Sequence, residues 1–182
     1  MGGPCRYLYL YLYLKHTTEC GLVYRKTGED IQGFLDADWG ASIDDRRSYT
    51  GYVFCMARAA VSWESRKQRS VALSSTEAEY MALSECAKEA VLLRRFMDEV
   101  FNRKEEITIF NDNQGAGMLS KNPVYHNRTK HVDIRYHFVR DAVLNGEVVV
   151  KYMRTEEMPA DVLTKGLSPL KHNMCSIKMG VM

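Results

Sequence analysis

The sequence predicts one α/β domain built on a mixed five-stranded sheet, and three observations lead to this fold class. Strand patterns follow one another closely at residues 31–39, 49–56 and 60–63, which is typical of an antiparallel meander. Two later strand patterns, at residues 106–110 and 147–153, alternate with helical ones, which favours strands parallel to the first. A long amphipathic helix separates the two groups. We therefore expect helices on the faces of the sheet.

The composition limits the classes of protein to which this chain can belong. The chain has 182 residues, 46% of them hydrophobic and 26% charged, as in a globular domain of ordinary size. A formal charge of +2 means that contact with nucleic acid must come from local basic patches. The five cysteines are scattered without a C-x-x-C pair, which argues against a disulfide framework or a zinc site. No apolar run reaches membrane-spanning length.

The first residues form a separate segment. Tyr and Leu alternate over residues 7–14, and this period of two together with the aromatic content predicts a strand. A connector follows, and the break at residues 27–30 separates it from the first strand of the meander.

The long helix begins at a match to the S-x-x-E capping box, with Ser74 as N-cap and Glu77 three residues later. Apolar residues then recur in steps of three and four as far as Phe101. Glu77 stands four residues before Met81, so this spacing predicts that it projects from the buried face. A buried carboxylate is costly without a cationic partner. The competing interpretation is that Glu77 only caps its own helix.

The second half of the chain alternates helices with strands. Helical patterns are expected at residues 114–120 and 131–144, with Asn145-Gly146 as a stop signal. Pro159 stands at an allowed first-turn position, so a last helix is predicted to begin there and to include residues 159–165.

Four acids fall at junctions between strands and helices, where ligands bind in an open α/β sheet. They are Asp36, Glu77, Asp112 and Asp161. Four converging carboxylates would repel one another unless divalent cations lay between them. Oxygen ligands suit Mg²⁺ or Mn²⁺ better than zinc. Two such ions would clamp the attacking and leaving oxygens of a phosphodiester, which indicates phosphoryl-transfer chemistry with water as the nucleophile.

An ordered set of short segments makes the chain recognisable. They are DADWG at 36–40, RSYTGY at 47–52, VSW at 61–63, KQ at 67–68, ALSSTEAEY at 72–80, DN at 112–113, RTKHVDI at 128–134 and ADVLTK at 160–165. From about residue 21 onward the chain resembles the ribonuclease H domain of copia-type LTR retrotransposon Pol polyproteins. The resemblance implies a ribonuclease H-like fold for residues 31–182. Residues 1–30 then correspond to a truncated connector from the preceding reverse transcriptase.

The resemblance also implies an activity: Mg²⁺-dependent endonucleolytic hydrolysis of the RNA strand of RNA–DNA hybrids during reverse transcription. The family's catalytic, metal-binding acids carry over onto Asp36, Glu77, Asp112 and Asp161. Two Mg²⁺ ions are expected, with Mn²⁺ as the alternative. The implied partners are the hybrid and the polymerase of the parent polyprotein, without a membrane. We expect a monomeric fragment in a cytoplasmic virus-like particle or the nucleus, and not a secreted protein.

Six residues are candidates for nucleic-acid contact, and each has a simpler interpretation as a cap or a solvated turn. They are Ser74, Ser75, Thr76, Arg128, Lys130 and His131. The first three could meet sugar hydroxyls in the minor groove, and the others could meet phosphates at a helix start. The basic run Arg66, Lys67 and Arg69 either follows the hybrid backbone or is a solvated charge run.

Two alternatives compete with an active ribonuclease H. The chain could be an inactive retrotransposon remnant that at most binds nucleic acid, which its repetitive start motivates. It could also be an integrase-type nuclease on the same fold, since Asp112 and Glu147 have a similar spacing to that family's acids. That interpretation leaves Glu77 and Asp161 without a role. One departure from cellular ribonucleases H is that the loop at residues 153–158 lacks their His.

Overall fold

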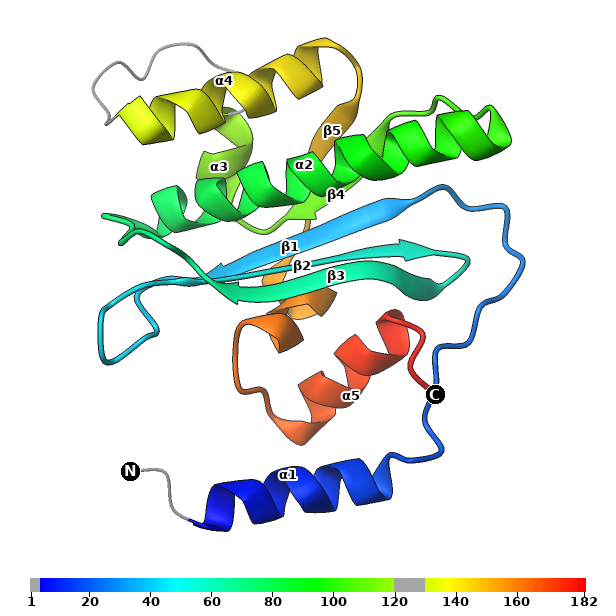
Figure 1. Ribbon diagram of the computed structural model, residues 1–182, viewed down its shortest axis with the longest axis vertical. Helices are drawn as coiled ribbons and strands as arrows, with labels where there is room; N and C mark the ends of the chain where they lie inside the picture. The colour runs from blue at the N-terminus through cyan, green and yellow to red at the C-terminus, as the bar shows by residue number, and fades with distance from the viewer. Residues whose placement is uncertain (1–3, 120–129) are drawn as a thin grey trace.

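A computed structural model gives the arrangement of the chain and describes residues 4–119 and 130–182 (Figure 1). For residues 4–7, 9, 118–119 and 130–133 only the backbone is described. The five-stranded sheet has the order β3-β2-β1-β4-β5. Its strands are β1 (Gln32–Asp38), β2 (Tyr49–Met56), β3 (Ala59–Lys67), β4 (Ile107–Asn111) and β5 (Val148–Tyr152).

The pairing of the strands confirms the mixed sheet. β1 pairs antiparallel with β2, and β2 pairs antiparallel with β3. β4 lies parallel to β1 on its other side, and β5 lies parallel to β4. The carboxyl ends of β1, β4 and β5 therefore meet at one edge of the sheet, which is where the acids were expected.

Helices cover both faces (Figure 1). One face carries α2 (Ser75–Phe101), α3 (Gln114–Leu119) and α4 (Lys130–Leu144). On the other side lie the 3₁₀ helix η2 (Pro159–Leu163) and α5 (Pro169–Lys178), preceded by the short η1 (Thr155–Glu157). Because both faces are covered, Leu35, Asp36 and Ala37 are all buried although successive side chains of a strand point to opposite faces.

The first half of α2 is enclosed on several sides. It packs on the sheet, and α4 lies over it with the rings of Tyr80 and Tyr136 stacked at a centroid distance of 3.9 Å. Seven consecutive residues, 78–84, are buried as a result. The far half is more exposed and ends at Asn102, whose left-handed backbone caps the helix.

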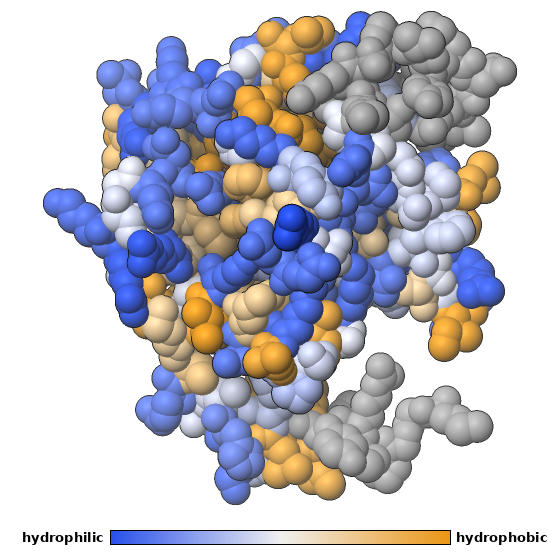
Figure 2. Space-filling view, turned by 180° about the vertical axis from the view of Figure 1, so that it is seen from behind, coloured by the Kyte–Doolittle hydropathy of each residue, from blue (hydrophilic) through white to orange (hydrophobic). Residues whose placement is uncertain are grey.

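The predicted strand at residues 7–14 is wrong, because this segment belongs to α1 (Pro4–His16). A strand needs a neighbour to satisfy its backbone groups, whereas a helix bonds its own. α1 lies beyond α5, where Tyr13 meets His172 edge to face at 5.8 Å. Seen from behind, hydrophobic side chains gather at the end of the molecule that holds α1 (Figure 2).

The last predicted helix is also corrected. Residues 159–163 form only a 3₁₀ helix, and a separate helix, α5, begins after Ser168, whose side chain accepts a hydrogen bond from Lys171 N. Within the described part of the chain, no helix combines the length and the apolar character needed to cross a bilayer. The four cysteines whose side chains are described are free thiols.

Candidate active site

Asp36 is the centre of the acidic site. It lies on β1 opposite Gly51 of β2, and it is only 1% exposed. The hydroxyl of Thr164 donates to one of its carboxylate oxygens, and Lys165 Nζ lies 2.9 Å from the other. Burial raises the pKa of Asp36, and the neighbouring Lys165 opposes this shift. The carboxylate therefore depends on nearby positive charge to remain ionised.

Asp112 and Asp161 converge on Asp36. Asp112 directly follows β4, whereas Asp161 is carried by η2 on the opposite side of the sheet from α2. One carboxylate oxygen from each of the three acids lies within 4.8 Å of the others. Asp161 is 1% exposed and Asp112 is partly exposed, so the cluster opens to solvent on the Asp112 side.

The fourth acid of the site is Glu79. Its Oε1 accepts a hydrogen bond from Ala37 N at 3.2 Å, and its Oε2 accepts from Asn111 Nδ2 at 3.4 Å. The side chain thus joins β1 to β4 directly beside Asp36 and Asp112. Burial, followed by the charges of these two aspartates, raises the pKa of Glu79 to about 9. A cation bound nearby would favour the ionised form of this carboxyl group.

The structure does not bring Glu77 to this cluster. Ser74 Oγ accepts from Glu77 N at 3.1 Å, and Glu77 Oε2 accepts from Leu73 N at 2.9 Å, so Glu77 serves the cap of α2. The expectation from its spacing to Met81 fails because the first turn of α2, at residues 75–77, is not buried, whereas residues 78–84 are buried on every side of the helix. The signal for Glu79 was present in the same S-S-T-E-A-E-Y segment, but helical spacing alone could not choose between the two acids.

Two lysines, which the prediction of the site did not include, neutralise part of the acidic charge. Lys165 lies 2.9 Å from Asp36 and 3.3 Å from Asp161, and Lys171 lies 2.5 Å from Asp161. Burial alone would lower the pKa of Lys165, but Asp36 and Asp161 outweigh it and raise this pKa. With every group ionised, the four acids still exceed the two lysines by two negative charges.

The predicted nucleic-acid contacts are only partly described. Ser74 is the N-cap of α2, and Ser75 and Thr76 form its first turn. Arg128 lies outside the described residues, as do the side chains of Lys130 and His131. Thr76 lies against α3, close to where a side chain on Gly115 would stand.

Known proteins give matches in sequence. The chain is 42% identical over 169 residues to the "Retrovirus-related Pol polyprotein from transposon TNT 1-94" of Nicotiana tabacum. It is 36% identical over 171 residues to the Pol polyprotein of transposon RE2 of Arabidopsis thaliana. Each alignment includes 93% of this chain. The chain matches a region of copia-type retrotransposon Pol polyproteins. It spans only 13% and 12% of the length of these two relatives, and no protein-family model matches it.

Solved structures agree on the fold of this Pol-like region. LC11-RNase H1, isolated from compost, superposes with a TM-score of 0.55 at 16% identity, covering 74% of this chain and 92% of that one. A ribonuclease H domain from Mycobacterium tuberculosis gives a TM-score of 0.53 at 11% identity, covering 81% and 94%. At such identities the likeness concerns the fold alone, and that fold is ribonuclease H-like.

Proposed function

We propose that this Pol-like region hydrolyses the RNA strand of RNA–DNA hybrids in a reaction that requires divalent cations. The observation that carries the proposal is the convergence of Asp36, Asp112 and Asp161 within 4.8 Å. Support comes from the Pol polyprotein relatives. LC11-RNase H1, which shares the fold, has also been solved in complex with an RNA/DNA hybrid.

The residues present fit a site for Mg²⁺, with Mn²⁺ as the alternative. All candidate ligands are carboxylate oxygens, which hard cations prefer. The raised pKa of Glu79 and the excess of acidic over basic groups indicate that the cluster lacks counter-charge. We assign Asp36, Asp112 and Asp161 as ligands, with Glu79 in the place for which the sequence suggested Glu77. Bound cations would supply an activated water and neutralise charge on the phosphodiester.

The chain's own groups hold the carboxylates in position. Thr164 and Lys165 fix the two oxygens of Asp36, and Glu79 is fixed by the backbone of β1 and by Asn111. Such restraint matters because catalysis depends on groups placed before the substrate arrives. Asp112 is partly exposed, so a phosphodiester can approach the cluster from the side of Asp112.

The loop that lacks the His of cellular ribonucleases H is nevertheless tied to the site. Thr155 Oγ1 donates to Asp112 Oδ2 at 2.7 Å, and Lys171 Nζ donates to Thr155 O at 2.7 Å. Glu156 and Glu157 are exposed, and neither belongs to the acidic cluster. We propose that Lys171, which lies 2.5 Å from Asp161, supplies the positive charge beside this loop.

The placement of Glu147 counts against an integrase-type site. Glu147 directly precedes β5, and its carbonyl accepts from Ile107 N at the start of β4. Asp112 follows the other end of β4, five residues away, or about 17 Å along a strand. Glu147 also lies 3.9 Å from Arg94, away from the acidic cluster.

Other parts of the prediction stay proposals. They are the assignment of residues 1–30 to a reverse transcriptase connector, the polymerase as partner, a monomeric state, and a location in virus-like particles or the nucleus.

The deciding experiment is cleavage of a fluorescent RNA–DNA hybrid by the full chain in Mg²⁺. We expect cleavage in the RNA strand and its loss in Asp112→Asn, with both proteins showing the same circular dichroism spectrum. Binding without cleavage by the unmutated chain would instead favour the inactive remnant. Cleavage that survives in Asp112→Asn would contradict the proposed site.

A further inference from the structure

The helix α5 holds the segment that carries Asp161. Lys171 Nζ lies 2.5 Å from Asp161 Oδ2 and donates to Thr155 O at 2.7 Å. Cys175, one turn further along α5, lies against the same segment and has no exposed surface. The hydroxyl of Thr155 also donates to Asp112. The position of α5 therefore affects two of the three clustered aspartates.

The end of α5 is held by a clasp of three segments, which are residues 21–25, 57–60 and 179–182. The last of these lies between the other two and forms backbone hydrogen bonds with both, and Figure 1 shows the end of the chain beside the connector. Val23 N donates to Gly180 O at 2.9 Å. Gly21 N donates to Met182 O at 2.8 Å, and Met182 N donates back to Gly21 O at 3.0 Å. The connector is thus paired with the chain that leaves α5.

The hairpin between β2 and β3 forms the other side of the clasp. Its two tip residues, Ala57 and Arg58, both have left-handed backbone, with φ of 54° and 63°. Glycine, asparagine and aspartate are the residues that usually occupy such a turn. Arg25 N donates to Ala57 O at 2.8 Å, and Ala60 N donates to Met179 O at 2.9 Å. The connector and the end of the chain therefore support a turn that is strained by its own residues.

Gly180 occupies the narrowest point of the clasp. It is buried with a left-handed φ of 78°, and a methyl group there would stand 2.6 Å from both Ala59 Cα and Arg58 O. Any side chain at this position must push residues 179–182 away from the hairpin. A cavity of about 350 Å³ lies between the connector, the hairpin and the end of α5. The clasp thus meets over a hollow, and such an element opens more easily than a packed core.

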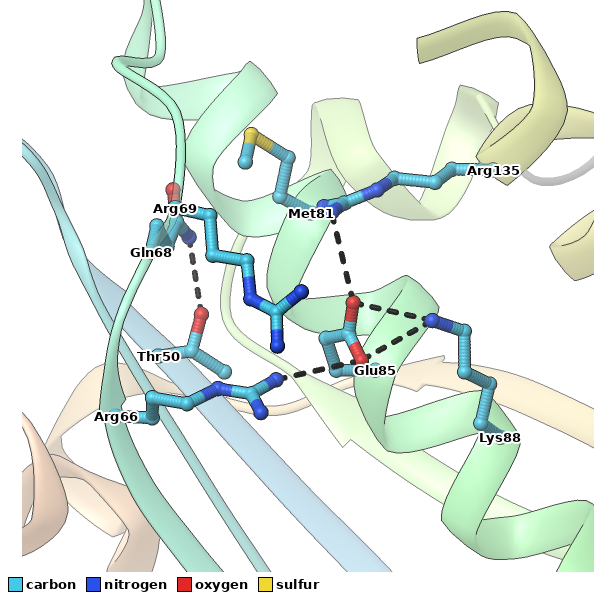
Figure 3. Close-up of a pocket in the computed structure, with 8 residues that line it drawn as sticks. All are labelled: Thr50, Arg66, Gln68, Arg69, Met81, Glu85, Lys88 and Arg135. Carbon is cyan, nitrogen blue, oxygen red and sulfur yellow. Dashed lines mark hydrogen bonds and ion pairs between the residues drawn. The ribbon is translucent and has the colours of Figure 1, made fainter. Parts of the chain in front are cut away.

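The opposite face of the sheet is tied together without the clasp. Glu85 of α2 lies 3.5 Å from Arg66 of β3 and 3.6 Å from Arg135 of α4 (Figure 3). The neighbouring Cys86 has no exposed surface and belongs to the main hydrophobic core. Opening of the clasp would therefore expose Cys175 on α5 and leave Cys86 covered.

We infer that the clasp positions Asp161 through α5, so that opening it at the connector weakens cation binding at the acidic cluster. The path runs from Val23 through Gly180 and the backbone of α5 to Lys171. When α5 loses its anchor, the segment from Thr155 to Asp161 is no longer held against β1. A divalent cation needs its oxygen ligands at fixed distances, so displaced carboxylates bind it less tightly. The inference rests on the proposed function only for the presence of a cation site.

The first test compares Gly180→Ala with Gly146→Ala in the full chain. Gly146 also has a left-handed φ, 64°, but a methyl group there would meet nothing within 4 Å. The control therefore has the backbone strain without the collision, and neither change removes a charged group. Alkylation of Cys175 and Cys86 by iodoacetamide in EDTA is followed by peptide mass spectrometry, and Mg²⁺ binding is measured by isothermal calorimetry.

Gly180→Ala is expected to raise the labelling rate of Cys175 relative to Cys86 about tenfold and to weaken Mg²⁺ binding about tenfold, as expected for a side chain forced into a packed site. Gly146→Ala should leave both values near those of the unmutated chain. Val23→Pro, which removes the N–H bonded to Gly180 O and adds nothing beside the hairpin, should change both in the same direction by about threefold. Val23→Ala keeps the N–H and is its control.

The outcomes separate the clasp from the nuclease. Labelling and Mg²⁺ binding by Gly180→Ala that match Gly146→Ala would overturn the inference, and so would exposure of Cys175 with unchanged Mg²⁺ affinity. Equal labelling of Cys86 and Cys175 would mean that the whole fold is lost, and Val23→Pro then decides. Coupled changes in a chain that cleaves no hybrid would support the clasp and contradict the nuclease. Absence of Mg²⁺ binding by the unmutated chain would overturn both proposals.

Discussion

Lys165 Nζ lies 2.9 Å from Asp36 Oδ1 and places a positive charge inside the cluster that we assign to divalent cations. The lysine also reaches Asp161 at 3.3 Å. In the metal-free protein this arrangement relieves repulsion between two buried carboxylates. When a cation binds, this ammonium group must move away or share its carboxylate partners, Asp36 and Asp161, with the cation.

We therefore expect Lys165→Met to bind Mg²⁺ more tightly. A hydrogen bond to a charged group contributes about 1.5–3 kcal/mol, and a tenfold change in affinity corresponds to about 1.4 kcal/mol. Isothermal calorimetry should show a dissociation constant lower by about tenfold, together with a lower melting temperature in EDTA. Lys178→Met, which removes a lysine whose Nζ donates to Glu157 O, is the control. Weaker Mg²⁺ binding by Lys165→Met would show that the lysine supports the cation site instead of competing with it.

Glu79 and Glu77 make a matched pair for mutation, because they stand two residues apart on α2. Glu79→Gln should reduce hybrid cleavage by about 100-fold or more, the loss seen when a positioned electrostatic group is removed. Glu77→Gln should leave kcat nearly unchanged and cost only about 0.3–1 kcal/mol, because Gln can still accept from Leu73 N and only the negative charge at the helix N-terminus is lost. Steady-state kinetics and thermal melting check both. A larger loss of kcat in Glu77→Gln would restore the first assignment.

Sequence reasoning reached the mixed sheet, with its antiparallel meander and its parallel later strands, and three of the clustered acids, because each depends on a local pattern. Asp36 and Asp112 follow from strand ends, which periodicity can locate. The choice between Glu77 and Glu79 depends on which side of α2 the sheet lies. Helical spacing cannot show this, because residues 78–84 are buried on every side of the helix, and only the tertiary structure shows that Glu79 faces β1. The strand predicted at residues 7–14 was wrong for a similar reason, because the alternation of Tyr and Leu cannot reveal whether a neighbouring strand is available.

The state of Glu79 predicts how stability of the metal-free protein depends on pH. Its folded pKa of about 9 lies above the ordinary value of 4.5, so between these values the unfolded chain loses this proton first and stability falls as pH rises. The charged groups that face it are Asp36 and Asp112, which raise the pKa of Glu79, and Lys165, which lowers it. Melting in EDTA should show Glu79→Gln more stable than wild type at pH 8, by a few kcal/mol, each of which corresponds to about 2–4 °C, with the gain absent at pH 4. An equal gain at both values would contradict the raised pKa.

Gly51 decides whether η2 can bring Asp161 against β1. It pairs with Asp36 across the sheet, and a methyl group there would stand 2.7 Å from Leu163 Cβ and 2.8 Å from Thr164 Cγ2. Gly51→Ala must push η2 outward, so we expect a loss of about 1–3 kcal/mol and a fall in kcat that exceeds any change in KM. Gly166→Ala, whose added methyl would meet nothing within 4 Å, is the control for both measurements. If Gly51→Ala melts and turns over like wild type, η2 can shift without disturbing Asp161, and the close packing of this 3₁₀ helix on β2 is not what holds the acidic cluster together.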